Sequence, residues 1–136
     1  KVIEKIIFKY LKINNFFEEN IDLIIPVPLH KSRLKERGFN QSEILAKIIA
    51  KKEMLKIEKE NLIRIKKTIP QIELNAKERK ENIKGAFILR MPEKIQNKTI
   101  LLIDDVYTTG STIKECAKVL QKAKVKTIYA FTFAHG

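Results

Sequence analysis

The chain has 136 residues, of which 44% are hydrophobic and 32% charged. This length fits one domain over residues 1–136, and this apolar content supports a core and excludes a disordered tail. Lys and Arg number 28 against 16 Asp and Glu, a formal net charge of +12. Such an excess suits a polyanionic partner, either nucleic acid or a phosphorylated small molecule, although a Lys-rich composition without functional meaning would give the same charge.

The cysteine content and the apolar pattern exclude further classes. Cys116 is the only cysteine in the sequence, which excludes an internal disulfide and a multi-cysteine zinc ribbon. Apolar runs stay well short of the roughly 20 residues of a membrane span. Charges interrupt the apolar positions of residues 1–12, unlike a signal peptide. We therefore expect a cytoplasmic protein that does not insert into a membrane.

The first third of the chain predicts helix, strand, loop and helix. Apolar residues recur at helical spacing within residues 1–19. Residues 21–28 form an apolar run closed by two prolines, which is typical of a buried strand entering a loop. Residues 28–39 are expected to be a basic loop. Asn40 then fits a helix N-cap, with Glu43 placed to complete a capping box.

The middle of the chain predicts two short strands around a long polar segment. The strands cover residues 62–65 and 86–89. Between them, residues 66–84 are mostly polar and have weak helical character at 76–83. A polar segment of this length in a compact domain is typical of a functional flap or lid. We call residues 66–84 the hood segment.

The last third contains the clearest strand and helix. Residues 99–103 are a buried strand, and residues 111–122 place apolar side chains at helical spacing. Residues 127–134 alternate like a strand. Strands that alternate with helices predict an α/β fold with a mostly parallel twisted sheet and helices on both faces.

The strongest chemical signal is the stretch Asp-Asp-Val-Tyr-Thr-Thr-Gly-Ser-Thr at residues 104–112. Ligands of parallel α/β sheets bind beyond the carboxyl ends of strands. Two adjacent acids there can accept hydrogen bonds from sugar hydroxyls or hold hydrated Mg²⁺. Gly110 permits a tight turn, and the helix that follows offers free N–H groups to a phosphate.

These residues describe a ribose-5-phosphate pocket: acids for the ribose, then donors for the phosphate. The alternative is an ordinary capped turn between a strand and a helix, with exposed acids. The stretch is neither a Walker loop nor a dinucleotide-binding fingerprint, because the required lysine and glycine spacings are missing.

The stretch 104–112 resembles the phosphoribosyl pyrophosphate (PRPP) signature of the type I phosphoribosyltransferases. The chain as a whole resembles the ComF family of competence-associated, phosphoribosyltransferase-like proteins. Two further blocks carry this resemblance. The first block is Pro-Val-Pro-Leu-His at 26–30 together with Arg-Leu-Lys-Glu-Arg-Gly-Phe-Asn-Gln-Ser at 33–42. The second block consists of matching positions between residues 64 and 87, the first of which is Arg64. Together the blocks span about residues 21–134.

The resemblance implies a role for each matching residue. Asp104 and Asp105 would be catalytic, contact the ribose hydroxyls and orient Mg²⁺ through water. The phosphate loop would add Val106, Tyr107, Thr108, Thr109, Gly110, Ser111 and Thr112. Contacts to the pyrophosphate are expected from Arg33, Lys35, Arg37 and Gln71. The hood segment would be flexible and close over the site, with Lys67 and Arg79 as further catalytic candidates.

The sequence departs from the family pattern in one respect. Many ComF proteins carry an N-terminal zinc-binding cysteine cluster, whereas this chain has only Cys116, which fits a packed small residue. No zinc is therefore expected, and the chain is either a short member or one whose front end is missing. His30 follows a strand end and is open to two interpretations, an incidental residue or a general base.

Two functions follow from these observations. The first is a PRPP-binding protein that transfers a phosphoribosyl group, with Mg²⁺, to an acceptor that the sequence does not name. The second is a non-catalytic accessory of DNA uptake that binds single-stranded DNA, suggested by the net charge and the basic residues 31–37. The resemblance adds natural transformation as the setting, with a competence helicase or DNA-processing proteins as partners.

Overall fold

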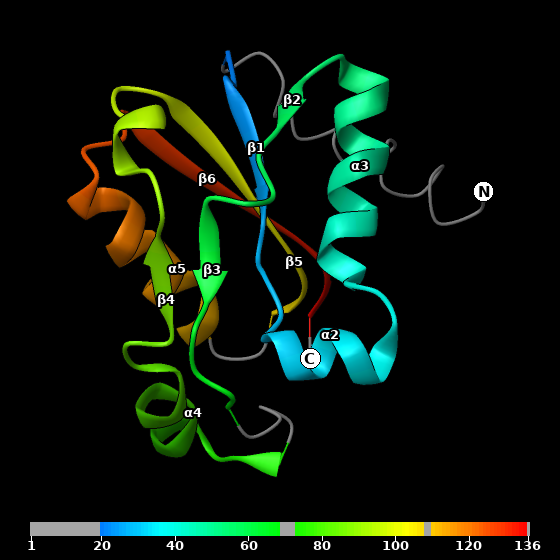
Figure 1. Cartoon of the computed structure of the whole chain (residues 1–136), viewed down its shortest axis with the longest axis vertical. Coiled ribbons are helices and arrows are strands. Elements are labelled where there is room, and N and C mark those ends of the chain that lie inside the picture. Colours follow the sequence, from blue (N-terminus) through cyan, green and yellow to red (C-terminus); the bar gives the residue numbers. More distant parts are fainter. Residues whose placement is uncertain (1–19, 69–72, 108–109, 136) are drawn as a thin grey trace.

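A four-stranded parallel sheet organises the chain (Figure 1). The computed structural model describes residues 20–68, 73–107 and 110–135, and leaves aside the side chains of 106, 107 and 133–135. The helix expected within residues 1–19 lies outside this range. The strand order is β2-β1-β5-β6. The strands are β1 (Leu23–Pro26), β2 (Lys56–Ile57), β5 (Thr99–Tyr107) and β6 (Thr127–His135).

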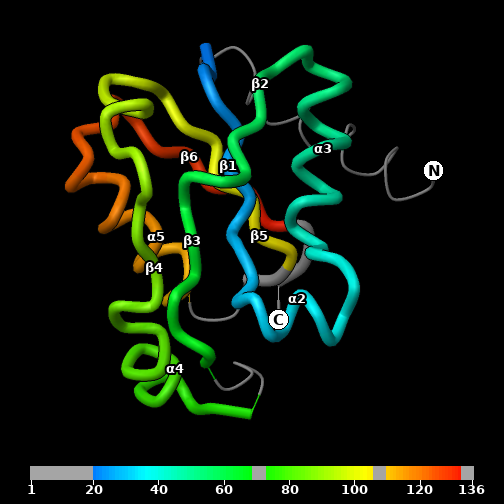
Figure 2. The backbone as a smooth tube through the Cα atoms, viewed as in Figure 1, coloured from blue at the N-terminus to red at the C-terminus, as the bar shows by residue number. Residues whose placement is uncertain are grey.

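A separate antiparallel pair lies beside this sheet. It consists of β3 (Leu62–Arg64) and β4 (Phe87–Leu89), which run side by side in Figure 2. The hood segment connects them and contains helix α4 (Ala76–Ile83), started by a capping box between Asn75 and Glu78. Where β3 begins, the Asn61 amide donates to the carbonyl of Met91 and accepts from its N–H, both at 2.8 Å.

Alternation along the central strands creates a core on each side of the sheet. Leu101 and Ile103 face α3 (Gln41–Glu53), together with Ile24 of β1. Ile100 and Leu102 face the other way, toward α5 (Ser111–Lys122) and the β3–β4 pair. The two helices thus cover opposite faces, so the expected α/β architecture with a parallel sheet is confirmed. None of the helices in the described ranges is long and apolar enough to cross a membrane.

The basic segment after β1 is a helix, not the expected loop. Helix α2 covers Lys31–Arg37 and buries none of its residues, so it lacks the apolar stripe by which amphipathic helices are recognised. Its ends hold it instead. His30 caps the start, and Gly38 ends it with φ of +80°, donating its N–H to the carbonyl of Leu34 at 2.8 Å.

Strand β5 continues four residues beyond the predicted end at Ile103. The cause is its partner, because β6 pairs with β5 as far as Tyr107 and His135. The acidic pair therefore lies on a strand and not in a loop. Phe39, which follows α2, is 47% exposed and therefore does not pack in the core. The structure also adds the short strand β2 and a 3-10 turn at Pro92–Lys94, neither of which has a sequence pattern of its own.

Truncating Leu45 tests the α3 side of the core. Leu45 is 1% exposed, whereas Ile44 on the same helix is 42% exposed. Leu45→Ala should lower the free energy of unfolding by about 2–5 kcal/mol, because it leaves a cavity. Ile44→Ala, the matched control, should change it by about 0.5 kcal/mol or less. Urea unfolding of both variants measures this, and equal losses would contradict the assigned packing.

Candidate functional site

The acidic pair sits where three segments of the chain meet. Asp104 is buried, and one of its carboxylate oxygens accepts from the N–H of Asp105 at 2.9 Å and from the hydroxyl of Ser42 at 3.3 Å. Ser42 lies in the first turn of α3, which Asn40 caps by accepting from the Ser42 N–H at 3.1 Å. The Asn40 amide also donates to the carbonyl of Val27, just after β1, at 3.1 Å. The end of β1, the start of α3 and the end of β5 are thereby joined.

Burial strongly perturbs the first acid of the pair. It raises the pKa of Asp104 to about 7, and the side-chain hydrogen bond and the charge of Asp105 act in the same direction, whereas the hydrogen bond from the Asp105 backbone N–H lowers this pKa. The donated hydrogen bond of Ser42 works against this shift. Asp105 is half-buried and is the more accessible carboxyl of the two. The carboxylate form of Asp104 is costly in this setting, and a nearby cation would favour it.

A helix N-terminus follows the acids closely in sequence. Gly110 is the N-cap of α5 and adopts φ of +79°, a left-handed conformation that favours glycine. Its carbonyl accepts the first helical hydrogen bond from Lys114 at 2.9 Å. Ser111 and Thr112 lie half-buried in the first turn. The expected phosphate-binding residues Thr108 and Thr109 lie outside the described ranges, and the side chains of Val106 and Tyr107 are not described.

Arg64 was not among the expected site residues, yet it lies close enough to Asp104 for that residue's charge to act on its pKa. It stands on β3, its guanidinium lies 5.1 Å from the ring centre of Phe87, and one terminal nitrogen donates to the carbonyl of Pro28 at 3.4 Å. Within the described residues, its Nε is buried without a hydrogen-bond partner. Burial lowers the pKa of Arg64, while the charges of Cys116 and Asp104 raise it. A cation in the apolar run 62–65 is the signal that could have identified it.

The residues expected to contact pyrophosphate and the catalytic candidates of the hood segment do not all lie together. Arg33 donates to the carbonyl of Thr68 at 2.7 Å and lies close enough to Arg64 to lower that residue's pKa. Lys67 forms an exposed ion pair with Glu36 at 3.9 Å. These contacts join α2 to the start of the hood segment. The other expected residues are elsewhere or not described: Lys35 and Arg37 are exposed in the last turn of α2, Arg79 is half-buried on α4, and Gln71 lies outside the described ranges.

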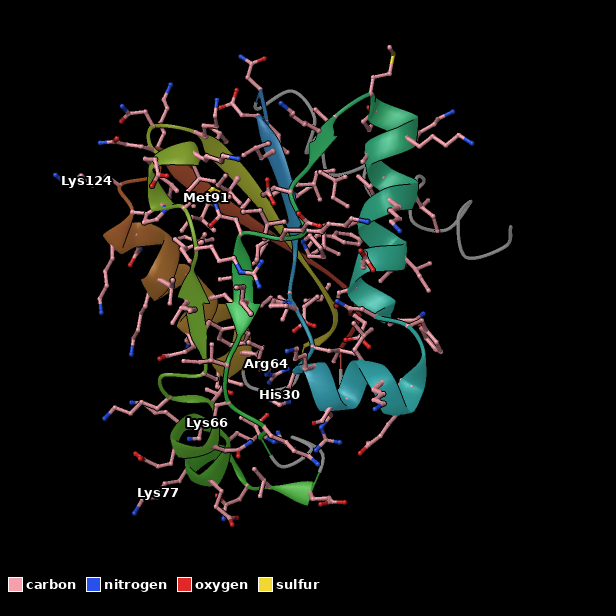
Figure 3. All side chains as sticks on the ribbon, in the orientation of Figure 1. His30, Arg64, Lys66, Lys77, Met91 and Lys124 are labelled. Carbon is pink, nitrogen blue, oxygen red and sulfur yellow. The ribbon has the colours of Figure 1, made fainter. Side chains whose placement is uncertain are left out.

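His30 caps a helix, and Cys116 packs in the core. The Nδ1 atom of His30 accepts from the backbone N–H of Ser32 at 3.2 Å and lies 2.9 Å from its hydroxyl, so the ring caps α2. Figure 3 shows His30 near Arg64 at the start of that helix. Cys116 is fully buried in the core beneath α5, and burial raises the pKa of its thiol. The interpretation of Cys116 as a packed small residue is confirmed.

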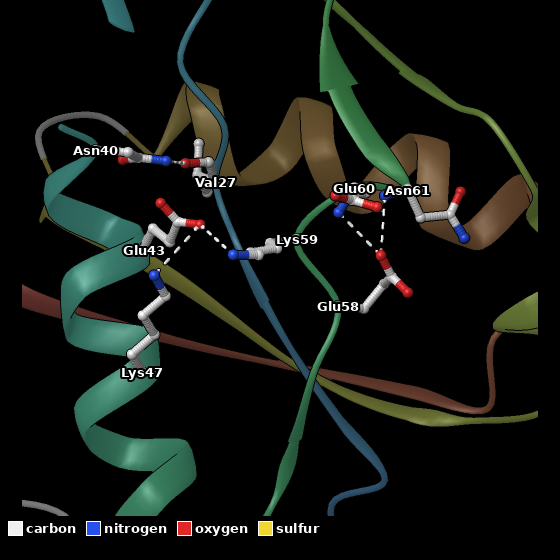
Figure 4. Close-up of polar contacts among 8 residues, drawn as sticks. All are labelled: Val27, Asn40, Glu43, Lys47, Glu58, Lys59, Glu60 and Asn61. Atoms are coloured by element: carbon white, nitrogen blue, oxygen red, sulfur yellow. Dashed lines mark hydrogen bonds and ion pairs between the residues drawn. The ribbon is translucent and has the colours of Figure 1, made fainter. Parts of the chain in front are cut away.

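A hollow of about 310 Å³ is lined in part by the first turn of α3. Glu43 lines it, and its carboxylate lies 3.6 Å from the Lys59 ammonium and 3.9 Å from that of Lys47 (Figure 4). Glu43 therefore pairs with lysines, unlike the expected capping box. The lining residues are Pro26, Pro28, Leu29, Leu34, Asn40, Glu43, Lys59, Glu60, Leu62, Ile63 and Arg90. Neither acid of the pair is among them.

The buried acid should control how stability depends on pH. An aspartate in the unfolded chain titrates near about pH 3.9, whereas the folded pKa of Asp104 is about 7. Between these values the folded state keeps a proton that the unfolded state releases, so the free energy of unfolding should fall as pH rises from about 4 to 7. Asp104→Asn should remove this fall.

Urea unfolding at a series of pH values, in buffer without divalent cations, measures this effect. Glu93→Gln removes an exposed carboxylate far from the pair and should keep the wild-type profile. Parallel profiles for Asp104→Asn and the wild type would contradict the raised pKa.

The chain matches a known protein family, and its fold matches known structures. The family described as "Phosphoribosyl transferase domain" matches residues 2–136. A hypoxanthine phosphoribosyltransferase from Staphylococcus aureus superposes with a TM-score of 0.56 at 18% identity, covering 96% of this chain and 61% of that one. An allosteric regulatory enzyme of purine biosynthesis also superposes with a TM-score of 0.56, at 16% identity, covering 85% of this chain and 23% of that one. At these identities the likeness shows the fold alone.

Sequence relatives are closer. Competence protein F of Haemophilus influenzae is 39% identical over 118 residues, which are 85% of this chain and 51% of that protein. The DNA utilization protein YhgH of Escherichia coli K12 is 39% identical over 99 residues, 73% and 43% of the two chains. Competence protein ComFC of Bacillus subtilis is 31% identical over 114 residues, 81% and 43%.

The chain thus spans about half the length of the curated relatives that it matches, or somewhat less. The resemblance to the competence proteins is confirmed by these relatives. Since the family match extends over nearly every residue, this protein belongs to the phosphoribosyl transferase domain family.

Proposed function

We propose that the chain binds PRPP at the acidic pair and the start of α5. The observation that carries this proposal is the position of Asp104 and Asp105. They lie in the last four residues of β5, just past its pairing with β1 and still beside β6, and Gly110 begins α5 shortly after the strand ends. Carboxylates at such a strand end match the hydroxyls of a ribose, and a helix N-terminus matches its 5-phosphate.

The donor chemistry of the pair fits Mg²⁺. Carboxylate oxygens and water are the ligands that Mg²⁺ prefers. Asp105 is the accessible acid, and Asp104 is the buried one whose negative charge a divalent cation would stabilise. Asp105 would hold the ion and Asp104 would hold it through water. Bound with PRPP, Mg²⁺ would neutralise charge on the leaving pyrophosphate.

The proposed reaction is phosphoribosyl transfer to an acceptor. The bond from the anomeric carbon to pyrophosphate breaks, pyrophosphate leaves with the electron pair, and the acceptor bonds to the same carbon. Arg64 and Arg33 lie together between β3 and α2, where their charges would stabilise that leaving group. The hood segment, with Lys67, Gln71 and Arg79, would exclude water from the reacting carbon.

We further propose a role in DNA uptake, in the cytoplasm. The names of the relatives, competence and DNA utilization proteins, support this role. A competence helicase or DNA-processing proteins would be the partners. The second candidate function is that of a non-catalytic accessory that binds single-stranded DNA, and the net charge of +12 favours it.

Calorimetric titration tests the PRPP site. Wild-type protein should bind PRPP in the presence of Mg²⁺, and the double variant Asp104→Asn with Asp105→Asn should not, because both sugar and metal contacts are removed. Glu58→Gln with Glu60→Gln changes two carboxylates elsewhere and serves as the control. A folded wild type that does not bind PRPP would refute the proposal. Pyrophosphate release by the wild type but not by Asp105→Asn would extend binding to turnover.

Arg64 should act on one end of PRPP only. Arg64→Gln should weaken PRPP binding roughly ten- to hundred-fold, the effect of about 1.5–3 kcal/mol for a hydrogen bond to a charged group. Its affinity for ribose 5-phosphate, which lacks the pyrophosphate, should stay unchanged. Arg90→Gln, at an exposed arginine, is the control. Equal losses for both ligands in the Arg64 variant would assign Arg64 to the fold rather than to pyrophosphate.

A further inference from the structure

Helix α5 and the turn after it expose an unusual row of lysines. Lys114, Lys118, Lys122, Lys124 and Lys126 are all exposed, and we call these five the lysine track. Residues 111–126 contain one carboxylate, Glu115, and no aromatic side chain. The local net charge is therefore 5 − 1 = +4.

The lysine track runs along α5 from the proposed phosphate site to the turn after the helix. Lys114, Lys118 and Lys122 are four residues apart, so they form one stripe with about 6 Å of helix between neighbours. The stripe starts one turn from Gly110, at the proposed phosphate site. At its other end, Lys124 and Lys126 make backbone hydrogen bonds to Asn97 and Lys98, and Lys98 is also exposed. Figure 3 labels Lys124 at this outer end of the molecule.

The single acid does little to neutralise the track. The side chain of Glu115 is 14% exposed. One of its oxygens accepts from the N–H of Gly85 at 3.0 Å, and the other lies 3.5 Å from the Lys118 ammonium. Glu115 therefore holds the segment before β4 against α5 and pairs with one lysine of the five. An exposed pair of this kind leaves most of the positive potential in place.

The helix on the opposite face of the sheet differs. Residues 41–53 of α3 carry three lysines and two glutamates, a local net charge of 3 − 2 = +1. The carboxylate of Glu43 there pairs with Lys47 and Lys59. The short helix α2 is also basic, although its Arg33 is bonded to the carbonyl of Thr68. Of the two helices that cover the faces of the sheet, α5 with the turn after it therefore carries the larger positive charge.

We propose that the lysine track binds the phosphate backbone of single-stranded DNA and leads the strand toward the phosphate end of the site. This inference rests on the proposed role in DNA uptake and moves the DNA contact from residues 31–37 to α5. A stripe one helix wide, about 12 Å long from Lys114 to Lys122, suits a few nucleotides of one strand. Without aromatic side chains or base-reading groups, binding is independent of sequence and governed by counterion release.

The test measures the affinity of a fluorescein-labelled (dT)20 by anisotropy at a series of salt concentrations. The track variant combines Lys118→Gln, Lys122→Gln and Lys124→Gln, and it keeps Lys114 because that residue lies at the proposed phosphate site. Each lost phosphate contact should reduce the slope of log affinity against log salt by about 0.7, so the slope should fall by about 2. The matched control combines Lys51→Gln, Lys52→Gln and Lys56→Gln on the opposite face and should keep the wild-type slope.

The outcomes separate this inference from the proposed enzyme site. PRPP binding, measured by calorimetry on the same proteins, should be unchanged in the track variant. Equal losses of slope in the track and control variants would overturn the track, because they would show diffuse attraction by net charge. Failure of the wild type to bind (dT)20 at low salt would also overturn it. A wild type that binds DNA but not PRPP would refute the PRPP proposal and leave the track standing.

Discussion

The structure depends on the parallel pairing of β5 between β1 and β6. Each residue of β5 from Thr99 to Ile103 pairs with β6, and four of them also pair with β1. Because side chains alternate along the strand, the four residues Ile100–Ile103 supply both cores and fix α3 and α5 on opposite faces. The strand then delivers the acidic pair to the edge of the sheet where both helices begin.

Burial of Asp104 is the main conflict in this arrangement. A carboxyl group occupies a position that the core would give to an apolar side chain, and its hydrogen bonds come from Ser42 and from the backbone of Asp105. Arg64 brings a buried cation nearby with an unpaired Nε. Within the described residues, Asp104 has hydrogen-bond partners, whereas the buried Nε of Arg64 has none. A strongly perturbed buried acid with a charge partner is typical of functional sites.

The sequence predicted those elements that have a periodic pattern of their own. Helix 111–122 was predicted to the residue, because its apolar positions follow one face. Helix α2 was missed because it buries nothing, and β5 was predicted too short because its last residues are held by pairing with β6 rather than by apolar content. Asp104 and Asp105 could be found from position alone. The approach of Arg64 could not, since it depends on how β3 folds back across the sheet.

The hydrogen bonds of the Asn61 amide have a consequence for how β3 and β4 are held. It makes two hydrogen bonds of 2.8 Å with the backbone of Met91, which fastens the beginning of β3 to the residues after β4. At the other end of the pair, Arg64 lies opposite Phe87 in the strand register. The two strands are therefore held together at both ends of the pair. Glu115 accepts a hydrogen bond from the N–H of Gly85, just before β4, and so connects the strand pair that carries Arg64 to the helix that carries the lysines.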